Sequence, residues 1–170
     1  MRNILSFICF TSAVAVCGAV IPVDSYKFDA PTLTEARGAY MDNDFKKLTN
    51  GDVSGKSRVI WELKKVPGKV VKISFKLQDK GAEKINLDIF RGPRSYGYKT
   101  IKLFAIVDGK PVLAVEQTFN HPYQLAADSK PYEKLTVDIP ENVPAANEYE
   151  LHVSGTGSYI GLCEVSFEKK

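Results

Sequence analysis

"VVKISFKL", residues 70–77, is the stretch that decides the fold class of this 170-residue chain. Apolar and polar side chains alternate along it, with Val71, Ile73, Phe75 and Leu77 at one parity and Lys72, Ser74 and Lys76 at the other. Successive side chains of a strand point to opposite faces, so the pattern predicts an antiparallel strand with one face buried and the other in water.

The same alternation recurs along most of the chain. It is found at residues 58–64, 85–90, 100–107, 112–119, 134–140 and 149–155. Asp108-Gly109 predicts a tight hairpin, because both residue types tolerate positive φ, and Pro67-Gly68 is a second turn signal. No long segment has helical spacing, and residues 33–40 predict one helical turn at most. About eight short strands separated by turns predict an all-β sandwich.

The N-terminal residues predict export. Arg2 precedes an apolar run at residues 4–16 and then small residues, which is the layout of a cleavable signal peptide. An uncleaved membrane anchor is the alternative, because the apolar stretch to Val23 nearly reaches the length of a membrane span. We prefer cleavage after Ala19. The predicted organisation of this secreted, extracellular protein is a signal peptide at 1–19, an N-terminal extension at 20–31 and one domain at 32–170.

Cysteine usage bears on the closing segment of the chain. Cys9 and Cys17 leave with the predicted signal peptide, so Cys163 is the only cysteine of the mature chain and cannot form an intramolecular disulfide. A buried thiol, an intermolecular bridge and a reactive thiol are the options. Cys163 lies in an alternating apolar stretch, which favours a buried, inert thiol.

Charge and motifs exclude several classes of function. Loss of Arg2 lowers the net charge from +3 to +2, and there is no basic block, so nucleic acid is not expected as a partner. The two histidines, His121 and His152, do not form a zinc motif, and no nucleophile elbow or phosphate loop is present. The chain is therefore predicted to be non-catalytic, although a triad or a carboxylate pair assembled in space would leave no such spacing.

Residues 42–57, "DNDFKKLTNGDVSGKS", have the composition of a calcium loop. Short oxygen-bearing side chains are gathered around Gly51 and Gly55. Calcium takes six to eight hard oxygen ligands, and loop carbonyls can supply several of them. An ordinary polar turn explains the composition equally well, because Asn, Asp, Gly and Ser are also the turn formers.

Residues 90–100, "FRGPRSYGYKT", join two predicted strands and are a candidate ligand site. The segment carries Arg91, Arg94, Tyr96 and Tyr98. Arginine forks donate bidentate hydrogen bonds and tyrosine rings offer flat faces, which suits the hydroxyls and the C–H face of a sugar. His121, in "NHPY", is a further candidate for the same rim. The alternative is a surface segment whose tyrosines cover an edge of the core.

The order of these segments resembles a discoidin-type, galactose-binding-like domain. "KLTNGD" at 47–52 is similar to the family's "IDG" loop, and a tryptophan-containing strand and an apolar strand follow it at 59–77. "INLDIF", a polar segment and "IKLFAIVDGKPV" continue the pattern, and "YELHVSGTGSYIGLCEVSFE" at 149–168 resembles the closing strands. The resemblance covers roughly residues 32–168 and implies an eight-stranded antiparallel jelly-roll sandwich.

The family includes fucose-binding lectins and other sugar-binding modules that hold a structural calcium, so the resemblance implies a Ca²⁺ site. It assigns backbone carbonyls to Lys47, Asp52 and Cys163, and a carboxylate to Glu164. Ser54 or Ser57 would add an oxygen. Asn50 stands where the family has Asp, which removes one negative charge and should weaken binding.

The family's function implies a lectin-like module that binds a glycan or glycoprotein. The fucose-binding pattern itself is absent, because Pro93 stands where an Asp belongs and no histidine lies between Lys56 and Trp61. A structural or cell-adhesion protein that binds a protein or a membrane surface is the alternative, and an accessory domain of an enzyme is a third. Lipid insertion is disfavoured because the candidate loops are polar and basic. The oligomeric state does not follow from the sequence.

Overall fold

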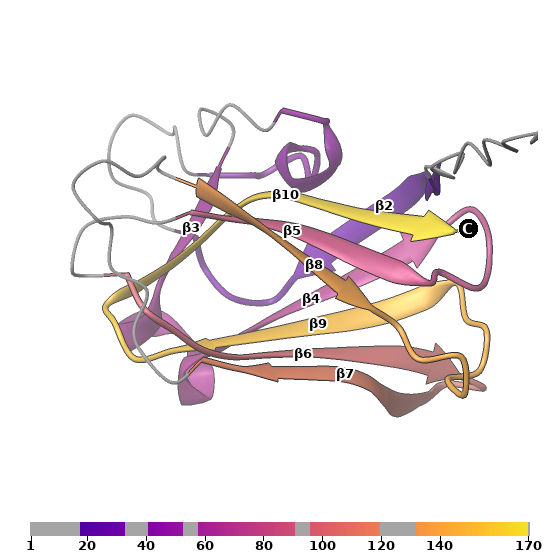
Figure 1. Ribbon diagram of the computed structural model, residues 1–170. Coiled ribbons are helices and arrows are strands. Elements are labelled where there is room, and N and C mark those ends of the chain that lie inside the picture. Colours follow the sequence, from indigo (N-terminus) through magenta and orange to yellow (C-terminus); the bar gives the residue numbers. More distant parts are fainter. Residues whose placement is uncertain (1–17, 33–40, 53–57, 91–95, 120–131, 170) are drawn as a thin grey trace, which may run out of the picture.

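The computed structural model describes residues 18–32, 41–52, 58–90, 96–119 and 132–169. Two β-sheets are stacked face to face, and every strand pairing within them is antiparallel (Figure 1). This confirms the predicted all-β sandwich. No helix in the described ranges has the length and apolar character that a membrane span requires.

The first sheet, sheet A, is built around the closing strand. It contains β1 (Ala19–Ile21), β3 (Val59–Glu62), β5 (Lys84–Phe90), β8 (Tyr132–Asp138) and β10 (Tyr159–Lys169). The order is β1-β10-β5-β8, and β3 pairs with the start of β10 on the edge that β1 occupies further along. β10 is therefore the central strand to which three others pair.

The second sheet, sheet B, has the order β2-β4-β9-β6-β7. Its strands are β2 (Val23–Phe28), β4 (Val70–Leu77), β6 (Tyr98–Val107), β7 (Lys110–Thr118) and β9 (Glu148–Gly155). Three single-turn 3-10 helices lie between strands: η1 (Lys47–Thr49), η2 (Leu63–Lys65) and η3 (Pro67–Lys69). Asp108 and Gly109 have φ of 50° and 72°, which confirms the tight hairpin between β6 and β7.

The core lies between the sheets and follows the predicted alternation. On β4, the side chains of Val71, Ile73, Phe75 and Leu77 are at most 2% exposed, while the alternate lysines point to water. Inward side chains of β9, the neighbour of β4 in sheet B, and of β10, in sheet A, complete this core. Phe75 packs edge-on against Phe167 of β10, with ring centroids 5.4 Å apart. Burial of these side chains from both sheets is the main driving force for the sandwich.

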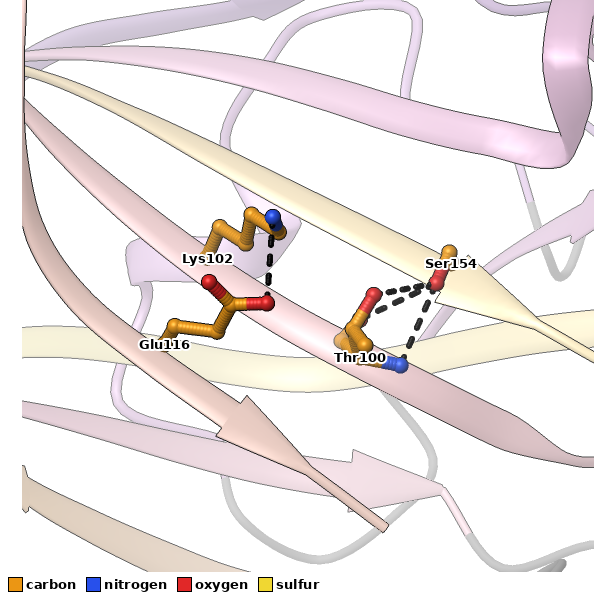
Figure 2. A network of polar contacts seen from close by, with 4 residues as sticks. All are labelled: Thr100, Lys102, Glu116 and Ser154. Carbon is orange, nitrogen blue, oxygen red and sulfur yellow. Dashed lines mark hydrogen bonds and ion pairs between the residues drawn. The ribbon is translucent and has the colours of Figure 1, made fainter.

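The outer face of sheet B is held by cross-strand polar pairs (Figure 2). Lys102 Nζ lies 3.0 Å from Glu116 Oε1, its register partner on β7. Ser154 accepts the N–H of Thr100 at 3.1 Å, and their hydroxyl oxygens are 2.5 Å apart. These four side chains therefore satisfy one another across neighbouring strands of this face.

The N-terminal boundary differs from the sequence expectation. Residues 20–31 were expected to be an extension outside the domain, but they contain most of β1 and all of β2. β1 pairs with the end of β10, and β2 pairs with β4. These two strands account for the difference between the eight strands expected and the ten described. Most of the predicted signal peptide, residues 1–17, lies outside the described residues.

Candidate functional site

A β-bulge in β10 organises the first candidate site. Leu162 pairs with Ile89 and Glu164 pairs with Asp88, so Cys163 is an extra residue with no register partner on β5. Such a bulge leaves one residue outside the ladder and locally re-aims the side chains around it. Bulges often occur next to functional sites, and this one falls at the residue to which the family resemblance assigned a ligand carbonyl.

The thiol of Cys163 is fully buried, as predicted, and forms no disulfide. Burial raises the pKa of Cys163 to about 12, and the nearby positive charge of Arg58 offsets only part of that effect. A thiol with so little thiolate at neutral pH is neither a nucleophile nor a ready metal ligand. Any role of this residue in a site therefore belongs to its backbone.

Glu164 meets the 47–52 loop across 113 positions of sequence. The N–H of Gly51 donates to Glu164 Oε2 at 3.1 Å, and the carboxylate is 7% exposed. Burial raises the pKa of Glu164 to about 7; hydrogen bonds from the backbone of Gly51 and Asn50 lower it, and the charges of Asp88 and Asp52 raise it further. The structure thus brings together the loop and the closing strand, two segments that the sequence joined only by family resemblance.

The loop holds its shape by internal hydrogen bonds. Asn50 Oδ1 accepts the N–H of Asp52 at 2.9 Å, and Gly51 has φ 76°, a left-handed conformation that favours glycine. Lys47 lies in η1, which packs on β10. The Asn50 side chain therefore closes the turn that presents the backbone of residues 50–52 to Glu164.

Asp42 and Tyr26 anchor the start of this loop, a role that the sequence did not reveal. Asp42 Oδ1 accepts the N–H groups of Lys46 at 2.9 Å and Lys47 at 3.2 Å. The Tyr26 hydroxyl donates to the Asp42 carboxylate and accepts the N–H of Leu48 at 2.9 Å. Asp42 was grouped with the oxygen-bearing residues of a calcium loop, but it is 4% exposed and binds the loop backbone. The β2 strand is thus tied directly to the candidate site.

The donor set fits a hard cation better than a soft one. No group of three or more His, Cys, Asp and Glu side chains converges for a metal in the ranges that the structure describes. Calcium does not need such a group, because loop carbonyls can supply several of its oxygen ligands. The buried Glu164 carboxylate lies beside a Gly-containing loop, and one divalent charge there would relieve its repulsion with Asp52 and Asp88. Ser54 and Ser57 lie outside the described residues.

The second candidate site is an aromatic and arginine cluster, Arg58, Phe90, Tyr96 and Tyr159, which we name the rim cluster. The Tyr96 ring centroid lies 5.1 Å from that of Phe90 and 5.4 Å from that of Tyr159. The Arg58 guanidinium carbon lies 4.4 Å from the Phe90 ring centroid. Tyr96, Tyr159 and Arg58 are partly exposed, while Phe90 is buried beneath them.

Tyr98 does not belong to this surface. Its side chain is 1% exposed, its single hydroxyl proton is shared between the carbonyls of Phe90 and Gly161, and its hydroxyl oxygen accepts the N–H of Gly161 at 3.1 Å. A ring in this position presents no face to a ligand. The expectation that Tyr98 contacts a sugar is therefore corrected: Tyr98 supports the rim cluster from within and joins β5 to β10.

Two residues of the rim cluster flank, in the sequence, the segment that carries the predicted arginines. Phe90 directly precedes residues 91–95 and Tyr96 directly follows them. Arg91, Arg94 and His121 lie outside the described residues, and their assignment stays a prediction. Sequence reasoning missed Arg58 and Tyr159, because they lie far away along the chain. Phe90 and Tyr96 connect them: Arg58 lies over the Phe90 ring, Phe90 contacts Tyr96, and Tyr96 contacts Tyr159.

Comparison of the whole fold with solved structures gives a consistent class. The chain has the architecture of the discoidin-type, galactose-binding-like sandwiches, a class that includes family 32 carbohydrate-binding modules and F5/8 type C domains. No protein-family model matches the sequence. No curated protein matches it either.

Three of these structures illustrate the likeness. The family 32 carbohydrate-binding module of NanJ from Clostridium perfringens, in complex with galactose, is 14% identical, has a TM-score of 0.57, and covers 89% of this chain and 98% of its own. An F5/8 type C domain from Bacteroides fragilis is 11% identical, with a TM-score of 0.58 and coverages of 88% and 97%. The fifth family 32 module of a Clostridium perfringens protein, in complex with GalNAc-β-1,3-galactose, is 14% identical, with a TM-score of 0.55 and coverages of 88% and 99%. At these identities the likeness establishes the fold.

Proposed function

We propose that this chain is a secreted, non-catalytic carbohydrate-binding module that recognises a glycan at the rim cluster. The observation that carries the proposal is the partly exposed pair of rings Tyr96 and Tyr159, which adjoins Phe90 with the Arg58 guanidinium over the Phe90 ring, where β5 ends and β6 begins. Sugar recognition needs a flat apolar face for the C–H side of the ring and charged donors for its hydroxyls, and this cluster supplies both kinds of group.

The similar structures support this choice of ligand class. Two of them were solved with galactose or a galactose-containing disaccharide, and a third, the family 32 module of AlyQ, with 4,5-unsaturated mannuronic acid. Neutral galactosides and uronic-acid oligosaccharides are therefore the first ligands to test. Arg58, with Arg91 and Arg94 in the adjoining segment, would favour the acidic member of a matched pair.

A structural calcium forms part of the proposal. Glu164 would bind it through its carboxylate, and the backbone carbonyls of the 47–52 loop and Cys163 would complete the oxygen shell. A bound ion would fix the loop against β10 and oppose the repulsion among the buried carboxylates. This would stabilise the fold and would supply no chemistry to a reaction.

A glycan array followed by titration calorimetry tests the binding site. Wild type, Tyr96→Ala and Arg91→Ala are compared with Phe104→Ala, a control that removes a partly exposed ring from the outer face of sheet B. We expect Tyr96→Ala and Arg91→Ala each to weaken binding at least about tenfold, or about 1.4 kcal/mol, and the control to bind like wild type. Absence of binding to any glycan, or equal binding by all four proteins, would refute the site.

A further inference from the structure

Asp88 is a buried carboxylate that neither the predicted site nor the family resemblance uses. It lies in the middle of β5 and is 6% exposed. Its register partner on β10 is Glu164, which is 7% exposed. Directly opposed residues of an antiparallel pair place their side chains on the same face, with Cβ atoms about 4.5–5.5 Å apart. Two buried carboxylates therefore lie side by side on the outer face of sheet A.

The bulge in β10 creates this juxtaposition. Leu162 pairs with Ile89, so an uninterrupted ladder would place Cys163 opposite Asp88. The extra residue at Cys163 moves Glu164 into that position instead. A regular strand would pair Asp88 with a small neutral side chain, which is the less repulsive arrangement. The fold accepts like charges here, and like charges directly opposed across strands are destabilising unless another group compensates them.

Within the described ranges, the surroundings of Asp88 compensate its charge only weakly. Lys134, its exposed register partner on β8, supplies a positive charge that partly offsets the rise in the pKa of Asp88 caused by burial. The Asp88 side chain accepts no hydrogen bond there. Buried carboxylates are normally hydrogen-bonded, paired or bound to a metal. Asp88 is thus as buried as a metal-binding carboxylate, but it lacks, among the described residues, the hydrogen bonds that usually hold a buried carboxylate with a purely structural role.

We propose that Asp88 is the second carboxylate of the cation site, beside Glu164. The proposal rests on the calcium loop proposed above and adds a residue from a different strand. The loop has one negative charge fewer than the family that the sequence resembles, because Asn50 is neutral where that family has an aspartate. Asp88 would supply the missing charge. Calcium affinity depends on the number of charged ligands, so a carboxylate from β5 would restore what the loop has lost.

Calcium titrations of purified protein test this role. The affinity is read from the calcium-dependent shift in melting temperature and from terbium luminescence sensitised by the protein's aromatic residues. Asp88→Asn should weaken affinity about tenfold and should leave stability in EDTA unchanged or higher, because it removes an uncompensated buried charge. Lys134→Gln should strengthen affinity, because it removes the positive charge that competes for Asp88.

The outcomes separate this role from its alternatives. If Asp88→Asn lowers stability equally in EDTA and in calcium and leaves the affinity unchanged, and Lys134→Gln does not change the affinity, then Asp88 only interacts with Lys134 and the inference is wrong. A wild-type protein that binds glycans but shows no response to calcium or terbium would overturn the cation site and the role of Asp88 together. In that case the glycan-binding function would stand.

Discussion

Removal of one hydroxyl, by Tyr26→Phe, should destabilise the protein far more than a typical surface change. The Tyr26 hydroxyl donates to the Asp42 carboxylate and accepts the N–H of Leu48, whose residue is fully buried. A hydrogen bond to a charged group contributes roughly 1.5–3 kcal/mol, and a buried donor left without a partner costs roughly 1–3 kcal/mol. The ring itself stays in place, because phenylalanine fills the same volume.

We therefore expect Tyr26→Phe to lower the free energy of unfolding by about 3 kcal/mol, since the two losses share one site and do not add fully. For a protein of this length that corresponds to a melting temperature about 6–12 °C lower. Urea denaturation followed by tryptophan fluorescence measures it, because the single tryptophan, Trp61, is fully buried.

The matched control is Tyr159→Phe, which removes a hydroxyl that has no hydrogen-bond partner in the described part of the chain. It should change the unfolding free energy by less than about 0.5 kcal/mol. If Tyr26→Phe costs no more than this control, Tyr26 does not anchor the 42–48 loop. The conclusion that β2 is an integral strand tied to the site would then fail.

Three further predictions concern the candidate cation site. In EDTA, the folded chain should keep a proton on Glu164 that the unfolded chain releases, because the pKa of Glu164 rises from 4.5 to about 7 on folding. Compared with Glu164→Gln, the wild-type protein should therefore lose about 3 kcal/mol of unfolding free energy between pH 4.5 and pH 8. Parallel pH profiles of the two proteins in urea denaturation would disprove this. Cys163 should resist alkylation by iodoacetamide in native protein at pH 8 and react once urea unfolds it, whereas rapid labelling of the native state would show that the thiol is accessible. Asn50→Asp keeps the oxygen that accepts the N–H of Asp52 and adds a negative charge. It should therefore tighten calcium binding, measured by calorimetry, by about tenfold. An unchanged affinity would exclude residue 50 from the site.

Alternating or apolar runs separated by turn signals were sufficient to predict the eight strands β3 to β10. This pattern failed at β2, where Tyr26 is the one buried position among six and the sequence VDSYKF has no sustained alternation of apolar and polar residues. The signal-like composition before it also concealed β1. β1 and β2 join the sandwich by pairing with β10 and β4. The alternation of apolar and polar residues along a strand does not show which strand it pairs with.

The candidate site was predictable only where residues are close in sequence or the resemblance supplied a distant partner. The resemblance linked the 47–52 loop to Glu164, and the Gly51 N–H donates to that carboxylate, while the calcium that the resemblance implies stays a prediction. Asp88 could not be found this way, since a bulge of one residue decides which side chain stands opposite it. Tyr98 was misassigned because sequence alone does not distinguish the last residue of a surface segment from the first residue of a buried strand.

The most direct test of the central claim is to map a bound glycan on the ¹⁵N-labelled protein by NMR, using the strongest ligand found on the array. Binding at the rim cluster predicts chemical-shift changes concentrated at Arg58, at residues 90–98 and around Tyr159. The outer face of sheet B around Lys102 and Phe104 should be unaffected. Shifts confined to that face, or spread evenly over the molecule, would contradict glycan recognition at this end of the sandwich.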